Sequence, residues 1–379
     1  MRIGMISSYP PIECGIAAYS EYLTQALRRK QNDVYIVSHV GGSGQQVFNG
    51  FDYEDGDLAH KAYSTMVRFT PDVVHIQHEF GLFGKFYGVS VIPLILQFRL
   101  TGIPVVTTLH TVYRNPDENH RLILQSILMH SNEVIVHEDY QKDALNAIMP
   151  FDVSHKIHVI EHGAREIDPV PDARNKLKLP EDKKIILLIG YFRPSKNFEL
   201  IVDLLPQVLK KYPDALLVLA GKIRGNEHID YRTRLFHRIE QSPVKDHIYL
   251  IRGQLKQDTF DTILSAADVV VLPYKINSQS GIMAHSLALA RPIVASDSGA
   301  MRRILERSGA GLVCKNDQEF VDNIVTILQN PALAEEMSRN ARKYVREHIS
   351  WSLIADRHID IYRKLIDKPL LESRIIWVE

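Results

Sequence analysis

Cysteine is scarce in this sequence of 379 residues, and net charge is absent. The two cysteines, Cys14 and Cys314, lie far apart and suggest no disulfide framework. This usage is typical of a reducing compartment, so we expect a cytoplasmic protein. The 45 Lys and Arg residues equal the 45 Asp and Glu residues in number, which leaves no net field for nucleic acid or a membrane. Any anion must therefore be bound by a local group of charges.

Long apolar runs and a secretory leader are also missing. No stretch approaches the roughly 18 apolar residues that a membrane-spanning helix needs. The N-terminal MRIGMISSYPP is typical of a short strand and a turn rather than of a signal peptide. We therefore expect a soluble protein whose only membrane contact would be peripheral.

Several catalytic fingerprints are absent as well. The chain has no G-x-G-x-x-G turn, no P-loop and no G-x-S-x-G elbow. Among its 17 histidines, no pair combines i, i+4 spacing with the third ligand of a zinc site. Asp55 and Asp57 have metal-like spacing, but they lie in an acidic loop that is typical of a solvated turn. We therefore expect no metal site and no serine hydrolase.

Short β-branched runs alternate with amphipathic helical stretches along the chain. Buried parallel strands have such continuous apolar runs, and the connections are long enough for helices. The first series of predicted strands is Arg2–Ser7, Asp33–Ser38, Val73–Gln77, Val105–Leu109, Glu133–His137 and Ile157–Ile160. The second series is Ile185–Ile189, Ala215–Ala220, Ile248–Ile251, Val269–Leu272 and Pro292–Ala295.

A change in composition separates the two series. Residues 161–184 carry three prolines, many charges and few apolar residues, as expected of a linker. We predict an N-terminal domain over 1–165 and a C-terminal domain over 166–351, each a doubly wound parallel α/β sheet of the Rossmann-like kind. The tail over 335–365 is predicted to be helical, with its aromatic side chains packed in a core.

Polar residues in the first domain stand where ligands bind in open α/β sheets. Gly15 precedes a helix and permits close approach to its N-terminus, with an ordinary tight turn as an equal alternative. His110 follows a strand and would donate a hydrogen bond or accept a proton, although a lone histidine is more often structural. His78 and Glu79 end the preceding strand, where the carboxylate would orient acceptor hydroxyls or form a surface pair.

Two cations follow the first strand of the second domain. Within GYFRPSKN, residues 190–197, Arg193 and Lys196 are three residues apart on a strand-to-helix loop. A guanidinium fork and an ammonium point charge at this spacing suit a diphosphate. We interpret the pair as an anion site, against the alternative of a solvated loop.

The segment PYKINSQSGIMAHSLALARPIVAS, residues 273–296, predicts a strand end, a polar loop, a helix that opens at Gly281 and another strand. The first N–H groups of a helix are unpaired and lie at the positive end of its dipole. A loop of small polar residues at this point predicts a phosphate cradle.

Together these motifs resemble glycosyltransferase family 4, a group of GT-B enzymes. The similar segments are PPIECGIAAYSEYL, QHEFGLFG, VVTTLHTV, VIEHGA, GYFRPSKNFELIV and DVVVLPY with SGIMAHSLALARPIVASDSGA. The resemblance implies two Rossmann-like domains facing a cleft, with a C-terminal helix over 352–379 packing back on the first domain. It also implies a nucleotide diphospho-sugar bound by the second domain, a carbohydrate acceptor bound by the first, a retaining reaction and no metal cofactor.

The resemblance also assigns roles to single residues. Gly15 would let the donor phosphates approach the first loop, and His110 would lie beside the transferring sugar. Arg193 and Lys196 would neutralise the departing diphosphate.

The loop before the helix at Gly281 departs from the family pattern. Ser280 and Gly281 would offer backbone N–H groups to the phosphates or the sugar. Where the family has two glutamates eight positions apart, for the donor sugar and the ribose, this chain has Asn277 and His285. Both side chains can hydrogen-bond hydroxyls, but neither has the negative charge of a carboxylate.

The leading hypothesis is a metal-independent retaining hexosyltransferase, a mannosyltransferase or glucosyltransferase that uses GDP-mannose or UDP-glucose and a sugar or glycan hydroxyl. One alternative is a GT-B phosphorylase that releases a sugar 1-phosphate, with Arg193 and Lys196 binding free phosphate. Another is a non-catalytic nucleotide- or sugar-binding homologue.

Overall fold

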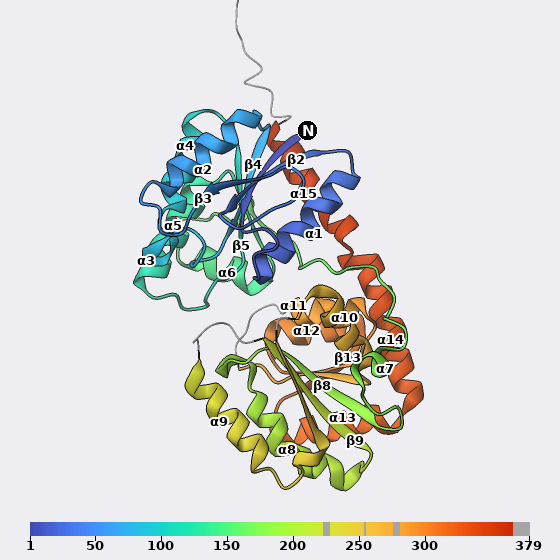
Figure 1. Cartoon of the computed structure of the whole chain (residues 1–379). Helices are drawn as coiled ribbons and strands as arrows, with labels where there is room; N and C mark the ends of the chain where they lie inside the picture. The colour runs from blue at the N-terminus through green and yellow to red at the C-terminus, as the bar shows by residue number, and fades with distance from the viewer. Residues whose placement is uncertain (223–227, 254, 276–280, 367–379) are drawn as a thin grey trace, which may run out of the picture. The chain divides into compact units, whose positions relative to one another are not determined.

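The computed structural model describes residues 1–222, 228–253, 255–275 and 281–366 (Figure 1). The chain divides into two compact units. The first comprises Met1–Gly163 together with the chain from Trp351 on, and the second comprises Ala164–Ser350. Each unit contains one parallel sheet with a hydrophobic core on either face.

The sheet of the first unit has seven parallel strands in the order β3-β2-β1-β4-β5-β6-β7. Their bounds are β1 Arg2–Ser7, β2 Asp33–His39, β3 Val47–Phe51, β4 Val73–His78, β5 Val105–Leu109, β6 Glu133–Val136 and β7 Ile157–Val159. The order reverses between β1 and β4, and ligands bind beyond the carboxyl ends of strands at such a switch point.

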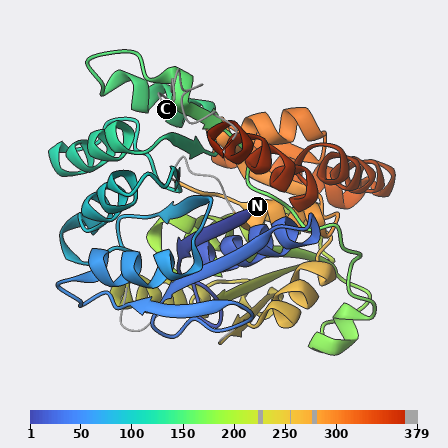
Figure 2. The ribbon, with the colours of Figure 1, turned by 90° about the horizontal axis from the view of Figure 1, so that it is seen from above.

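Alternate residues of these strands point to opposite faces, and both sets are apolar. Ile3 and Met5 belong to the core beneath α1 (Gly15–Arg29) and α15 (Trp351–Ile366). The dark red helix α15 packs against α1 and β4 (Figure 1, Figure 2). The other face is covered by α2 (Leu58–Met66), α4 (Val91–Leu100), α5 (Glu118–His130) and α6 (Asp139–Ala147), and α3 (Lys85–Gly88) lies beside α5.

The second unit has six parallel strands in the order β10-β9-β8-β11-β12-β13, with its switch point between β8 and β11. Their bounds are β8 Lys184–Tyr191, β9 Ala215–Lys222, β10 Ile248–Arg252, β11 Val269–Leu272, β12 Ile293–Ser296 and β13 Gly311–Cys314. One face packs on α8 (Phe198–Lys211), α9 (Ile229–Glu240) and α13 (Asp317–Gln329). The other packs on α7 (Ala173–Leu177), α10 (Gln257–Ala266), α11 (Gly281–Ala288), α12 (Gly299–Ser308) and α14 (Pro331–Tyr344).

Two strands and one break differ from the sequence prediction. Strands β3 and β13 were not predicted, because their short sequences VFNGF and GLVC contain residues that are depleted in strands. The tail over 335–365 is helical, as predicted, but it is interrupted at Ser350. Helix α14 leads into a π-helical turn, Val345–Ile349, and Ser350 is extended before α15 begins. Ser350 forms a β-bridge with Ala164, and this contact explains the break.

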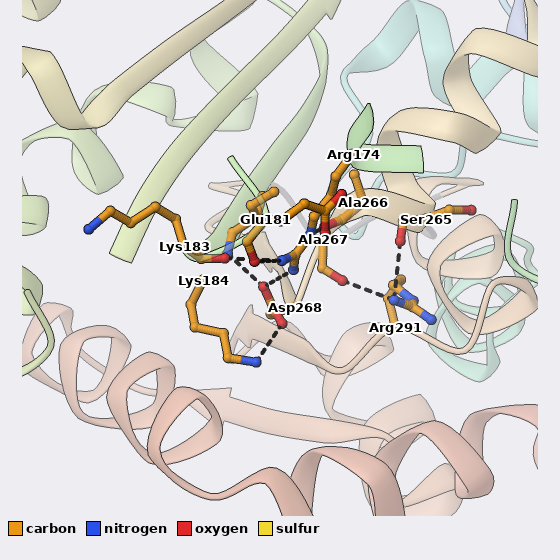
Figure 3. Close-up of polar contacts among 10 residues, drawn as sticks. Arg174, Glu181, Lys183, Lys184, Ser265, Ala266, Ala267, Asp268 and Arg291 are labelled. Carbon is orange, nitrogen blue, oxygen red and sulfur yellow. Dashed lines mark hydrogen bonds and ion pairs between the residues drawn. The ribbon is translucent and has the colours of Figure 1, made fainter. Parts of the chain in front are cut away.

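A polar network joins the linker to the amino edge of the second sheet (Figure 3). The carboxylate of Asp268 accepts hydrogen bonds from Arg174 Nη2 at 2.6 Å, Lys184 Nζ at 3.0 Å and the backbone N–H of Ile185 at 2.7 Å. Arg174 also donates to the carbonyl oxygens of Glu181, Lys183 and Ala266. Arg291 donates to the carbonyls of Ser265 and Ala267 nearby. Each charged group of this network therefore has polar partners.

In the described parts of the chain, the helices are too short or too polar to cross a bilayer.

Candidate functional site

The loop after β8 turns sharply and returns its cations to the end of the strand. Gly190 has φ +152°, a backbone conformation that strains any residue with a side chain. The 3₁₀ turn Pro194–Lys196 follows, and Asn197 then adopts a left-handed φ of 54°. Lys196 Cε lies 3.9 Å from the position of a Cβ atom added to Gly190, so the lysine side chain runs beside the strand end.

Lys196 lies on an aromatic ring rather than against a carboxylate. Its Nζ atom is 3.4 Å from the ring centroid of Tyr274, which is 5% exposed and follows β11. Arg193 is exposed at the surface. Neither cation forms an ion pair with any residue in the described ranges. Burial, together with the neighbouring Arg193, lowers the pKa of Lys196 well below its ordinary value.

The loops after β8 and β11 are joined to each other. The backbone N–H of Lys275 donates to the carbonyl of Ser195 at 3.1 Å. The ammonium of Lys275 pairs with Glu199 at 2.9 Å, and Glu199 also accepts a hydrogen bond from the hydroxyl of Tyr231. These contacts hold Tyr274 beneath Lys196 because they fix both loops at the switch point.

Helix α11 begins at Gly281, the position predicted from the sequence. Asn277 and Ser280, which the resemblance assigned to the donor, lie outside the described residues. Nδ1 of His285 is 3.3 Å from Nη2 of Arg165. Because a guanidinium can only donate, Nδ1 must accept, and the neutral ring therefore carries its proton on Nε2. His285 thus presents a donor where a carboxylate would present only acceptors.

Arg165 is a residue of this region that sequence reasoning missed. Its Nη1 donates to Oδ2 of Asp261 at 2.8 Å, and Gln257 donates to the same carboxylate at 2.8 Å. The ring edge of Phe260 also lies against His285, with 5.2 Å between the ring centroids. Arg165 lies in a highly charged linker, and no local pattern could pair it with an aspartate on α10.

The carboxyl edge of the first sheet carries a row of hydrogen-bonded neutral side chains. His110 Nε2 lies 2.8 Å from Oε1 of Gln77, and His110 Nδ1 lies 3.4 Å from Nε2 of His137. His137 Nδ1 donates to the carbonyl of Ile160 at 2.8 Å. Burial lowers the pKa of His137 to about 3 and that of His110 well below its usual range. His110 is therefore a neutral, oriented group, and its part in the reaction stays a prediction.

The predicted acceptor-side residues His78 and Glu79 differ in their exposure to solvent. Glu79 is partly exposed, and its carboxylate accepts from Thr111 Oγ1 at 2.6 Å and from the N–H of Phe80 at 3.1 Å. Burial raises the pKa of Glu79. His78 has no exposed surface, and its ring nitrogens have no hydrogen-bond partner among the described residues. Of this pair, the structure brings only Glu79 to the surface.

Gly15 opens α1, as the spacing predicted to within one residue. Cys14 caps the helix, and its sulfur accepts from the N–H of Ala17 at 3.2 Å. A Cβ atom added to Gly15 would meet no atom of the described chain within 4 Å. Packing within the described chain therefore does not require glycine here, which leaves room for a ligand at the N-terminus of α1.

A histidine cluster around Tyr19 was also missed. The Tyr19 ring is contacted by His110, His137 and His162 at centroid distances of 4.8, 5.3 and 5.3 Å, and by Trp351 at 5.0 Å. The sequence pattern could have predicted that two members of this cluster are neighbours, because His110 and His137 each come directly after a strand of the same sheet. Both side chains therefore belong to one edge.

Two doubly wound parallel units in one chain, with seven and six strands in the described parts, have the GT-B class of fold. The model of Glycosyltransferase Family 4 matches residues 14–165, and that of Glycosyl transferases group 1 matches residues 170–344. The chain therefore belongs to these glycosyltransferase families, and the predicted fold class and family are confirmed.

Individual relatives support the same assignment over nearly the whole chain. An uncharacterized glycosyltransferase of Methanocaldococcus jannaschii is 24% identical over 96% of this chain and 98% of its own. The phosphatidyl-myo-inositol mannosyltransferase of Mycobacterium tuberculosis is 24% identical over 96% of each. The structure of Anabaena HepE in complex with UDP superposes with a TM-score of 0.76 and 14% identity, covering 96% of this chain and 100% of HepE.

Proposed function

We propose that this glycosyltransferase moves a hexose from a nucleotide diphospho-sugar to a sugar or glycan hydroxyl, with retention of configuration and without a metal. The observation that carries the proposal is the pair Arg193 and Lys196 at the carboxyl end of β8, with no carboxylate partner among the described residues. Unpaired cations at a switch point favour an anionic ligand, and two adjacent cations favour a diphosphate.

The two cations would act mainly on the leaving group. As the bond between C1 of the sugar and the phosphate oxygen breaks, negative charge develops on the diphosphate, and Arg193 and Lys196 would stabilise it. The acceptor oxygen would attack C1 from the same face and pass its proton to the departing phosphate oxygen. No other proton acceptor is then needed, which agrees with His110, whose Nε2 donates to Oε1 of Gln77.

The remaining groups would bind and orient the substrates. The first N–H groups of α11 would contact the donor, and the Nε2 proton of His285 would donate to a hydroxyl or phosphate oxygen. Glu79, which already accepts from Thr111, would accept from an acceptor hydroxyl. Mannose or glucose is the proposed sugar, with support from the description of the mycobacterial relative as a mannosyltransferase and of the Anabaena structure as a UDP complex.

Purified protein incubated with GDP-mannose, UDP-glucose and ADP-glucose and a panel of sugar acceptors tests the proposal. We expect transfer, or slow donor hydrolysis, with at least one donor, and unchanged turnover in the presence of EDTA. K196M and R193Q should lose this activity, whereas K210M, a change of an exposed lysine in the same unit, should not. Absence of both transfer and hydrolysis with every donor would contradict the proposal.

A second candidate is a phosphorylase that cleaves a glycoside with inorganic phosphate. It is favoured by His285, which contacts Arg165 and occupies the position where the family pattern has a glutamate that would bind a ribose. A phosphorylase needs no ribose contact, and its cations would bind free phosphate. Phosphate-dependent release of a sugar 1-phosphate from disaccharides, without any nucleotide, would identify this reaction.

A further inference from the structure

The surroundings of Lys196 are unusual for a lysine that binds anions. Its ammonium is 3.4 Å from the centre of the Tyr274 ring, and the side chain is only partly exposed. No carboxylate within the described ranges pairs with it. The nearest like charge is Arg193, which begins the same turn.

Among the described residues, the other charged and titratable groups that contact this turn and the loop after β11 are paired with one another. Lys275, which follows Tyr274, forms an ion pair with Glu199 of α8. Glu199 also accepts from the hydroxyl of Tyr231 of α9. The negative charge of Glu199 is thus directed to Lys275 and Tyr231, whereas Lys196 lies on the Tyr274 ring and is repelled by the charge of Arg193.

We propose that Lys196 takes up a proton when a diphosphate binds beside it, so that donor binding and protonation of this amine are coupled, and that Tyr274 is the residue that positions the amine. The inference rests on the proposed function, since it assumes that the donor diphosphate binds at Arg193 and Lys196. It adds a step to that function: the site becomes fully cationic only when its ligand arrives.

The sign of the coupling follows from the two states of the site. Without a ligand, burial and Arg193 disfavour the charged amine and lower its pKa. A bound diphosphate brings two negative charges and raises that pKa again. Between the two pKa values, the free amine lacks the proton that the bound amine carries. One proton is then taken from solvent for each ligand bound, and affinity falls as the pH rises.

Calorimetric titration in two buffers with different ionisation enthalpies measures this proton directly. The probes are UDP-glucose, GDP-mannose and ADP-glucose, whose diphosphates are esterified at both ends and have no proton to lose between about pH 7 and about pH 8.5, a range that also lies below the ionisation of the uracil and guanine N–H groups. We expect uptake that rises toward roughly one proton in part of this range, with up to about a tenfold loss of affinity per pH unit there.

K196R is the decisive variant, because an arginine keeps its proton throughout this range. It should still bind the nucleotide sugar, within about tenfold of the wild-type affinity, but without proton uptake and with a flat pH dependence. R193Q removes the like charge, so its uptake should begin at a higher pH. K210M should match the wild type in both affinity and uptake.

The positioning role of Tyr274 has its own pair of variants. Y274F keeps the ring and should keep proton uptake, whereas Y274L should weaken binding by about three- to tenfold and shift the pH range of uptake. Thermal unfolding would show whether Y274L is folded, and the K196R comparison stands whatever that result.

The outcomes separate the coupling from the function. Binding without proton uptake across the whole pH range, or equal uptake in K196R, would overturn the coupling and leave the proposed function intact. Wild-type behaviour of folded Y274L would overturn the role of Tyr274. If none of the three nucleotide sugars binds, both the proposed function and this inference fall.

Discussion

The carboxyl edges of the two sheets share an architecture and differ in their charge. In the first unit, His110 and His137 are neutral, and each donates one hydrogen bond, His110 to Oε1 of Gln77 and His137 to the carbonyl of Ile160. In the second unit, Arg193 and Lys196 are basic side chains with no anionic partner among the described residues. A parallel sheet thus fixes where a ligand binds, while the loop residues determine whether that ligand is neutral or anionic.

The amino edge of the second sheet differs from its carboxyl edge, because its basic side chains have an acidic partner. There Asp268 neutralises Arg174 and Lys184, and the remaining donors of Arg174 bind backbone carbonyls. The second unit can therefore pair its cations, and at the carboxyl edge of β8 it does not. Unpaired charge beside a strand end favours ligand binding over stability, because it costs repulsion and desolvation in the absence of a ligand.

The largest expected effect comes from removing the cationic character of the second edge. K196M or R193Q should lower turnover with a nucleotide sugar by about 10²- to 10³-fold, because a donor to the developing charge is lost. The free energy of unfolding should stay constant or rise, since neither side chain has an ionic partner to lose in the described chain and each variant removes one unpaired basic group. Steady-state kinetics with K210M as the control would measure this. A fall of less than about threefold would show that the two edges do not differ in function.

Removing Asp268 from the amino edge of the second sheet should lower stability and leave turnover unchanged. D268A leaves Arg174 and Lys184 without their carboxylate and the N–H of Ile185 without its acceptor, so we expect a loss of about 2–3 kcal/mol in unfolding free energy. The turnover of the folded fraction should be unchanged. Urea denaturation would measure the loss, with D322N, a change in an exposed ion pair, as the control. A large loss of turnover at full stability would contradict the structural role.

The buried neutral His137 at the carboxyl edge of the first sheet should make the free energy of unfolding depend on pH in the acidic range. The pKa of His137 is lowered to about 3 in the folded chain, against an ordinary value of 6.5, so below pH 6.5 the unfolded chain binds more protons. Stability should therefore fall as the pH falls from about 6.5 toward 3, by about 1.4 kcal/mol per pH unit for each such histidine. H137N can still donate to the carbonyl of Ile160, and it should reduce this slope by the contribution of one histidine, about 1.4 kcal/mol per pH unit. Denaturation at several pH values would measure it, and an unchanged slope would contradict the assignment.

The smallest expected effect concerns the acceptor. E79Q keeps an oxygen for the Thr111 hydroxyl but loses the charge, so the KM for the acceptor should rise by about five- to tenfold while donor affinity stays constant. T111V provides a matched control that removes only the internal hydrogen bond. A change in donor affinity with either variant would contradict the prediction that Glu79 binds the acceptor.

The sequence predicted the strands well where their pattern was strong. Val105–Leu109 and Val269–Leu272 have the predicted bounds because each is a continuous run of β-formers. The strands β3 and β13 were missed because glycine and asparagine weaken such a pattern. At the site, the position of Arg193 and Lys196 after β8 was predictable, since both residues of the pair lie in one loop. The burial of His78 next to the partly exposed Glu79 was not, because it depends on packing against Phe80 and Phe83.

By itself, the sequence determined the alternation of strands and helices, the family, and the spacing of the two cations, because all three are encoded in neighbouring residues. Only the tertiary structure decided which groups meet these side chains. Tyr274 lies beneath Lys196 because β11 pairs with β8 and not with the strand that precedes it in the chain. Arg165 reaches His285 across 120 residues of sequence, and Gln77 reaches His110 across 33. Such contacts join distant parts of the chain, and no local pattern of polarity records them.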